Sequence, residues 1–258
     1  MPEYRVDFER PKRCAYAVCV FVINEGEKIR KQLIRMKPFV NEADVIVADG
    51  GSTDGSLTGE LFEAADATAF LVKTGAGKLS AQMRMALAWV MQRGYEGVIV
   101  IDGNGKDGVE AIPEFITRLK AGWDHVQGSR FVSGGIHQHT PLSRLLAVRL
   151  LHAPLVSAAA RFRYTDTTNG FRAYSRRFLM DPKVQPFREV FSCYELHYYL
   201  SIRAARKGFR VCEIPVSRVY PATGVVPTKI SPLRGNLLVF RTLLSACFGR
   251  YNPSSSQI

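Results

Sequence analysis

Short apolar runs alternate with amphipathic helical segments through the first half of the chain. Near-continuous apolar runs occupy residues 15–23, 44–49, 67–74 and 97–102, and helical periodicity follows each of them, at residues 27–36, 56–64, 78–94 and 110–122. Strands that are apolar throughout are buried on both faces, which is typical of a parallel sheet covered by helices on both sides. The pattern therefore predicts an α/β fold with a mostly parallel sheet.

The chain is strongly basic, and this limits the choice of partners. It has 258 residues, 47% of them hydrophobic, with a formal net charge of +12. This composition indicates a globular protein large enough to bury a full core. The charge favours an anionic partner, such as nucleic acid, a nucleotide-linked substrate or an anionic membrane surface. From Ser201 onward Glu213 is the only acidic residue, so the excess of positive charge is concentrated near the C-terminus.

Cysteine usage and hydropathy predict a cytoplasmic protein. The five cysteines are scattered without a Cys-x-x-Cys pair, as expected of reduced thiols. The N-terminal segment is polar and charged, unlike a signal peptide. The most apolar stretch, residues 145–162, is interrupted by Arg149, His152 and Pro154. We therefore expect the chain to lie against a membrane at most, and not to cross it.

Polar residues follow three of the predicted strands. Asn24 and Glu25 come after the first, Asp49 and Asp54 end the second, and Asp102 ends the fourth. Open parallel sheets bind ligands beyond the carboxyl ends of their strands, so these residues mark a candidate site. Helix capping is an alternative for Asp54 or Ser56 but does not explain Asp49. The glycine patterns of P-loop and dinucleotide-binding proteins are absent from the sequence.

Six segments resemble one known family when they are taken together. They are FVINEGEKI, VIVADGGSTDGS, TGAGKLSAQMRMAL, VIVIDGNGKD, QGSRFVSGG and TDTTNGFRAYSRRFL. Their order and spacing resemble the inverting GT-A glycosyltransferases of family 2, most closely the branch that contains dolichyl-phosphate mannose synthase and related polyprenyl-phosphate glycosyltransferases. The resemblance implies a Rossmann-like GT-A catalytic domain over residues 1–222. Residues 223–258 are expected to form a basic amphipathic helix and a disordered tail.

The resemblance also assigns a donor site. Residues at the strand ends and in two further loops would bind the nucleotide-sugar: Asn24, Glu25, Asp49, Asp54, Gly77, Lys78, Asp102, Gly103, Asn104, Lys106, Ser129 and Arg130. Lys78 and Arg130 would contact phosphate or sugar oxygens. The alternatives are a solvated lysine at the start of a helix for Lys78 and a structural ion pair for Arg130.

The sequence departs from the family pattern where a divalent ion is normally held. The Asp-x-Asp element falls on Asp102 and Asn104, and Lys106 replaces a glutamine of the mannose synthases. An amide oxygen is a weaker ligand than a carboxylate for Mg²⁺ or Mn²⁺, and an ammonium repels the ion. We favour Asp102 and Asn104 as ligands of such an ion together with the diphosphate. In the alternative reading, Lys106 and Lys78 neutralise the leaving diphosphate themselves.

The catalytic residues that the resemblance implies are Asp102, Asp166, Arg172 and Glu195. Arg172 would bind the acceptor phosphate or the donor diphosphate, because a guanidinium is a bidentate phosphate ligand. Glu195 is expected to face inward by helical phase. A polyprenyl-phosphate acceptor is already an oxyanion and requires no general base, whereas a sugar hydroxyl does. For a hydroxyl acceptor Asp166 is the first candidate base and Glu195 the second.

The predicted function is transfer of a hexose from a GDP- or UDP-linked donor to a polyprenyl-phosphate lipid at the cytoplasmic membrane face. Basic amphipathic helices at residues 141–163 and 231–251 would reach an anionic bilayer, with Arg144 and Arg149 snorkelling; core packing is the alternative. A glycan hydroxyl is the alternative acceptor. A nucleotidyltransferase or a basic nucleic-acid-binding domain is a remote alternative, and we expect no nucleic acid as partner. The sequence does not indicate an oligomeric state.

Overall fold

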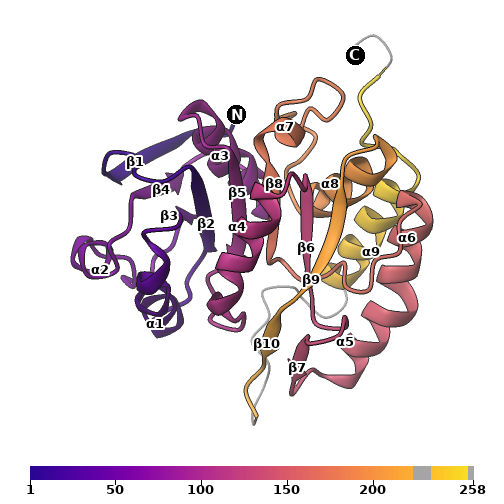
Figure 1. Cartoon of the computed structure of the whole chain (residues 1–258), viewed down its shortest axis with the longest axis horizontal. Coiled ribbons are helices and arrows are strands. Elements are labelled where there is room, and N and C mark those ends of the chain that lie inside the picture. Colours follow the sequence, from indigo (N-terminus) through magenta and orange to yellow (C-terminus); the bar gives the residue numbers. More distant parts are fainter. Residues whose placement is uncertain (223–233, 255–258) are drawn as a thin grey trace.

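The computed structural model describes residues 1–222 and 234–254 and contains one large sheet. The eight strands of this sheet are β1 (Tyr4–Glu9), β2 (Tyr16–Val22), β3 (Asp44–Asp49), β4 (Ala69–Lys73), β5 (Gly97–Asp102), β6 (His125–Ser129), β8 (Arg172–Ser175) and β9 (Val211–Pro215). Two short strands, β7 (Ile136–Gln138) and β10 (Ser217–Val219), pair in parallel beside it (Figure 1).

The order of strands in the large sheet is β1-β4-β3-β2-β5-β8-β6-β9. Strands β4, β3, β2 and β5 run parallel to one another, as do β6 and β9, so the predicted mostly parallel sheet is confirmed. Two antiparallel strands were not predicted. One is β1 at the edge, from the charged N-terminal segment, and the other is β8, which lies between β5 and β6.

Helices cover both faces of the sheet, because alternate residues of its strands point to opposite sides. In β2, Ala17, Cys19 and Phe21 join one apolar cluster, and Val18, Val20 and Val22 join the other. The first face is covered by α3 (Leu79–Gln92), α6 (Ala153–Ala160), α7 (Arg176–Leu179), α8 (Glu195–Arg206) and α9 (Arg234–Cys247). The second face is covered by α1 (Glu27–Met36), α2 (Gly59–Ala64) and α4 (Ile112–Lys120).

The other helical elements of the described residues are short: η1 (Lys37–Phe39), η2 (Val109–Ala111), α5 (Leu142–Leu146) and the π-helical η3 (Ala147–His152). The helix α2 begins later than predicted. Thr58 caps it by accepting a hydrogen bond from Leu61 N at 3.3 Å, so neither Asp54 nor Ser56 is the cap.

The C-terminal helix α9 is part of the main body of the protein. It packs against α6 and α8 (Figure 1), and its Leu243 and Ala246 are buried in the core. Residues 223–233 and 255–258 lie outside the described part of the chain, so the domain boundary at residue 222 and the disordered tail stay predictions.

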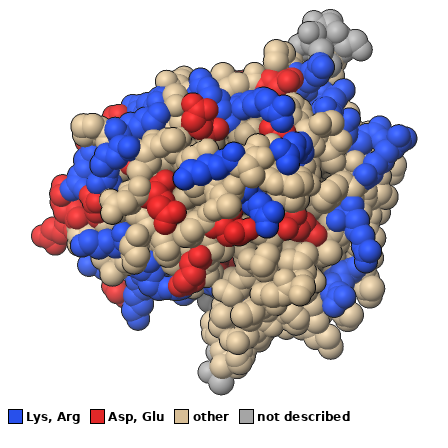
Figure 2. Space-filling model, viewed as in Figure 1, with Lys and Arg blue, Asp and Glu red and all other residues tan. Residues whose placement is uncertain are grey.

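One helical stretch, Leu142–Ala160, is long and apolar enough to cross a membrane, judged by length and composition alone. Its mean hydropathy is 1.3, and only 17% of it is buried. Basic side chains line the margin of the molecule on the side of α6, without visible acidic ones among them (Figure 2). The stretch therefore presents apolar surface beside a basic margin.

Candidate functional site

The carboxyl ends of β2, β3 and β5 lie side by side because β2 pairs with both neighbours. Val22 is level with Asp49 of β3, and Phe21 is level with Asp102 of β5. The loops that follow these strands therefore meet at one edge of the sheet. This edge, with the loops after β2, β3 and β5, is the candidate site.

The loops after β2 and β3 are tied together by their polar side chains. Asn24 accepts a hydrogen bond from Thr53 N at 2.7 Å, and its own N–H donates to Ser52 Oγ at 2.9 Å. Asp54 accepts from Gly26 N at 2.9 Å. Asn24 and Asp54 therefore lie together, with Glu25 between Asn24 and Gly26 in the same loop, and their contact with a nucleotide stays a prediction.

Asp49 shapes the turn that it begins. Its carboxylate accepts hydrogen bonds from Gly51 N (3.0 Å), Ser52 N (2.8 Å) and Ser52 Oγ (2.5 Å), and its side chain is buried. In the described structure Asp49 thus stabilises the loop, and a nucleotide would have to share its oxygens.

Two buried glutamines, which the sequence analysis missed, hold the strand ends in place. Gln82 of α3 donates to the carbonyls of Val22 (2.9 Å) and Ala48 (2.6 Å). Gln32 of α1 donates to Asp102 O at 2.9 Å and accepts from Gly105 N at 2.8 Å. The signal for both was present in the sequence, since each is an amide on the apolar side of a predicted helix.

The loop after β5 passes very close to β2, which explains the glycine that follows Asp102. A Cβ at Gly103 would lie 2.8 Å from Val22 Cγ2, closer than side-chain atoms approach one another. Asn104 then turns back, and its Nδ2 donates to Asp102 Oδ2 at 3.3 Å. The two residues of the altered Asp-x-Asn element are therefore neighbours.

Arg218 of β10 (Ser217–Val219) balances the negative charges of Asp102 and Asp107. Its buried guanidinium lies 3.4 Å from Asp102 Oδ2 and 2.5 Å from the buried Asp107 Oδ2. Burial opposes the charge, but Asp107 and Asp102 together hold the pKa of Arg218 above its ordinary value. Sequence reasoning missed Arg218, because only the long-range pairing of β10 with residues 106–108 brings it here.

Three basic side chains surround the Tyr220 ring, and we call them the Tyr220 cation cluster. Lys106 Nζ lies 5.3 Å, Arg144 Cζ 5.5 Å and Arg218 Cζ 5.8 Å from the ring centre. Arg144 also donates to the Tyr220 hydroxyl at 3.2 Å. Burial would raise the pKa of Tyr220, but Arg218, Arg144 and Arg130 outweigh it and lower that pKa. The cluster joins the loop after β5 to α5.

A divalent ion fits these residues poorly. Among residues 1–222 and 234–254, no group of three or more His, Cys, Asp or Glu side chains could hold a metal ion. Asp102 Oδ2 already faces Arg218 and the Asn104 amide, and Lys106 lies in the same loop. At the predicted metal position the Asp102 carboxylate therefore lies beside two cations, Arg218 and Lys106, and the nearby Asp107 is already paired with Arg218.

The predicted base Asp166 is buried in an ion pair with Arg130. The distance from Arg130 Nε to Asp166 Oδ2 is 2.6 Å, and that from Nη2 to Oδ1 is 3.0 Å. Burial raises the pKa of Asp166, but its hydrogen bonds and charge pairing with Arg130 more than offset this and lower it. A carboxylate held in this way is a poor proton acceptor. Arg130 therefore matches the structural alternative that was left open for it.

Arg172 is buried and turned away from solvent. Its guanidinium donates to the carbonyls of Thr167 (2.7 Å), Asn169 (2.9 Å) and His197 (2.8 Å), and to Ser201 Oγ at 3.0 Å. It thereby fixes the segment before β8. A Cβ at Gly170 of this segment would come within 2.9 Å of Asp102 Oδ1. In this structure Arg172 stabilises the segment around Gly170, which lies next to Asp102. Its contact with a phosphate stays a prediction.

The remaining predicted residues lie in two other places. Ser129 is buried and shares a hydrogen bond with Thr165 Oγ1 at 2.5 Å. Gly77 and Lys78 precede α3, and Lys78 N donates to Ser192 O at 2.7 Å. Glu195 faces inward as predicted and accepts from Cys193 N at 2.7 Å at the start of α8.

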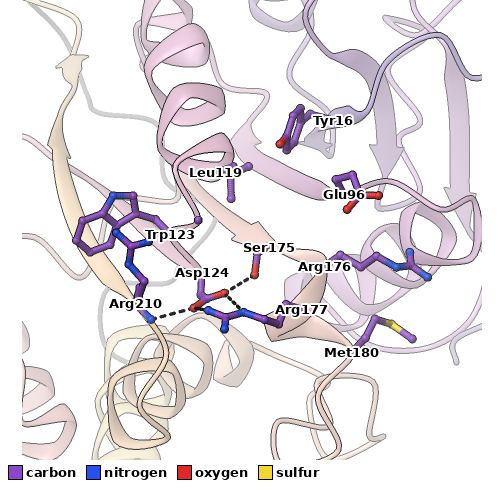
Figure 3. Close-up of a pocket in the computed structure, with 11 residues that line it drawn as sticks. Tyr16, Glu96, Leu119, Trp123, Asp124, Ser175, Arg176, Arg177, Met180 and Arg210 are labelled. Atoms are coloured by element: carbon purple, nitrogen blue, oxygen red, sulfur yellow. Dashed lines mark hydrogen bonds and ion pairs between the residues drawn. The ribbon is translucent and has the colours of Figure 1, made fainter.

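A hollow of about 710 Å³ lies at the opposite, amino edge of the sheet (Figure 3). Its Asp124 accepts hydrogen bonds from Ser175 Oγ (2.8 Å), Arg177 Nε (3.0 Å) and Arg210 N (2.9 Å). These contacts occupy the carboxylate and stabilise the start of β6, so we interpret this hollow as structural.

The chain is similar in sequence to curated glycosyltransferases. The chain is 27% identical over 224 residues to polyprenol monophosphomannose synthase of Mycolicibacterium smegmatis, covering 84% of this chain and 82% of the relative. It is 28% identical over 198 residues to undecaprenyl-phosphate mannosyltransferase of Micrococcus luteus, covering 76% and 80%. It is 29% identical over 231 residues to the glycosyltransferase AglJ of Haloferax volcanii, covering 88% and 71%. No family model matches the chain.

Solved structures agree on the fold. Glucosyl-3-phosphoglycerate synthase from Mycobacterium tuberculosis, in complex with Mn²⁺, UDP and phosphoglyceric acid, superposes with a TM-score of 0.62 at 20% identity. The match covers 93% of this chain and 80% of that one. The predicted GT-A fold and the family resemblance are therefore confirmed, and the chain is a homologue of the dolichyl-phosphate mannose synthase-like GT-A glycosyltransferases.

Replacing Asp166 by Asn should destabilise the protein, because Arg130 would lose the charge that balances it. We expect a loss of about 3–5 kcal/mol of unfolding free energy at pH 7, measured by urea denaturation. Since the folded pKa of Asp166 is lowered, its contribution is present above its unfolded pKa and disappears as the pH falls through the folded value. The difference between wild type and variant should therefore shrink below about pH 4.

The matched control is Asp7→Asn, which removes one charge from the exposed Arg5–Asp7 pair. It should cost less than about 1 kcal/mol. Equal stability losses for Asp166→Asn and Asp7→Asn would contradict the buried ion pair.

Proposed function

We propose that the protein is an inverting glycosyltransferase that moves a hexose from a GDP- or UDP-linked donor to a polyprenyl-phosphate lipid. The observation that carries the proposal is the homology to enzymes named for sugar transfer to polyprenol or undecaprenyl phosphate. The carboxyl edge of the sheet supports it, because Asn24, Asp49 and Asp102 meet there beside the Tyr220 cation cluster.

The state of Asp166 supports a phosphate acceptor over a sugar hydroxyl. A hydroxyl would need a base. Arg130, at 2.6 Å, helps to lower the pKa of Asp166 and so makes this carboxylate a weak base. A phosphate monoester attacks the anomeric carbon as an oxyanion and needs no proton acceptor. Glu195 remains the candidate base if a glycan hydroxyl is the acceptor.

The predicted Mg²⁺ or Mn²⁺ has support from solved structures of similar fold, but the residues at the predicted position do not support it. Fold neighbours hold Mn²⁺ together with UDP, which supports an ion. Asp102 and Asn104 alone fit it poorly, so the diphosphate would have to supply the remaining oxygens.

The exposed apolar face of residues 142–160 supports peripheral binding at the cytoplasmic membrane face. Leu142, Leu146 and Leu150 are exposed to 69%, 47% and 72% and follow one another at four-residue spacing, on one helical face. Arg144 turns inward to Tyr220, and Arg149 lies over Phe131 at 5.5 Å. The arginines therefore do not interrupt the leucine face.

The donor can be identified by thermal shift with UDP, GDP and CMP, followed by transfer of a labelled hexose to polyprenyl phosphate in detergent. Saturation at about 100 times Kd should stabilise the fold by about 2.7 kcal/mol. We expect UDP or GDP to do so, and transfer to be lost in Asp102→Ala. Glu27→Gln, which alters an exposed carboxylate of α1, should retain transfer. Stabilisation by none of the three nucleotides would contradict the proposal.

Membrane binding can be tested by sedimentation with vesicles that contain anionic lipid. The double variant Leu146→Glu and Leu150→Glu should bind at least about tenfold more weakly, because it places two charges on the apolar face. Ile34→Glu is the matched control, since Ile34 is an exposed apolar residue of α1. Equal binding of both variants would contradict docking through residues 142–160.

A further inference from the structure

The end of β5 carries an excess of positive charge before any ligand is added. Lys106, Arg144 and Arg218 converge on Tyr220, and within residues 1–222 and 234–254 the carboxylates paired with Arg218 are those of Asp102 and Asp107. An additional cation would increase this excess, whereas an anion reduces it. Electrostatics at this position therefore favours binding of an anion.

The geometry of Asp102 leads to the same conclusion. Its Oδ2 faces Arg218 at 3.4 Å and the Asn104 amide at 3.3 Å, and its Oδ1 lies against Gly170. Asp102 Oδ2 therefore already accepts from two donors. This set of contacts fits a divalent ion poorly.

The backbone of Lys106 is held from both sides. Its N–H donates to Asn104 Oδ1 at 3.2 Å, and its carbonyl accepts from Val219 N at 2.9 Å. The side chain is half-buried and lies 5.3 Å over the Tyr220 ring. An ammonium positioned in this way loses little entropy when it binds a ligand.

We propose that Lys106, supported by Arg218 behind it, forms a diphosphate subsite that binds the donor's diphosphate without a divalent ion. The inference rests on the proposed function and assigns the protein's own cations to the leaving group. Lys106 contacts the diphosphate, and Arg218 acts as a positioning residue that fixes Asp102 and the loop after β5.

The chemical step balances without a metal or a proton transfer. An oxygen of the acceptor phosphate dianion forms the new bond to the anomeric carbon. The bond from that carbon to the donor diphosphate breaks, and its electron pair stays on the β-phosphate oxygen. The acceptor loses one negative charge and the nucleoside diphosphate gains one, next to the Lys106 ammonium.

Inorganic pyrophosphate is the direct probe of this subsite. Isothermal titration of the wild-type protein in EDTA should show binding within about threefold of that in Mn²⁺, a difference of less than 1 kcal/mol. Lys106→Gln should weaken pyrophosphate binding in EDTA by at least about tenfold, because a charge-assisted hydrogen bond is lost. Lys31→Gln, an exposed lysine of α1, is the matched control and should bind as the wild type does.

A second variant should convert the proposed metal-independent subsite into a metal-dependent one. Asn104→Asp combined with Lys106→Gln adds a carboxylate next to Asp102 and removes the ammonium. Pyrophosphate binding by this variant should depend on Mn²⁺.

Pyrophosphate binding by the wild type only when Mn²⁺ is present would overturn the inference, as would unchanged affinity in folded Lys106→Gln. These outcomes are distinct from failure of the proposed function. If pyrophosphate binds in EDTA but no hexose is transferred from any nucleotide-sugar, the diphosphate subsite is supported and the proposed reaction is contradicted.

Discussion

The buried contact of Arg218 with Asp102 and Asp107 is the interaction on which the candidate site depends. It joins the end of β5 to β10 across more than 100 residues of sequence. Because a buried guanidinium without counter-charges is very unfavourable, the two carboxylates and the arginine must come together in the folded state. This requirement places Tyr220, Lys106 and Arg144 around the loop that the resemblance assigns to the diphosphate.

The sheet and its ligand-binding edge could be predicted from local patterns. Apolar strands such as residues 97–102 and the periodicity of helices α1 and α3 are properties of contiguous sequence. The first strand was missed because the N-terminal segment was interpreted only as polar and charged, although the apolar and charged alternation of YRVDFE is typical of a strand at an exposed edge. The antiparallel insertion of β8 depends on pairing with β5 and β6, which no local pattern indicates.

The roles of the charged residues were harder to predict, because they depend on partners far away in the sequence. The sequence makes Asp166 a candidate base, and only the fold brings Arg130 into an ion pair with it. The sequence makes Arg172 a candidate phosphate ligand, and only the fold shows that it donates to the carbonyls of Thr167, Asn169 and His197. The resemblance assigns segments to the site, and the packing of these segments decides which side chains can face a ligand; the site residues themselves stay predictions.

A crystal structure of the wild-type protein with bound UDP or GDP, grown in EDTA, would show which residues hold the diphosphate. We expect a diphosphate beyond the ends of β2, β3 and β5, within hydrogen-bonding distance of Lys106 Nζ, and a nucleoside over the loops of Asn24 and Asp49. A nucleotide bound at the amino edge near Asp124, or a diphosphate that contacts neither Lys106 nor the loop after β5, would contradict this expectation.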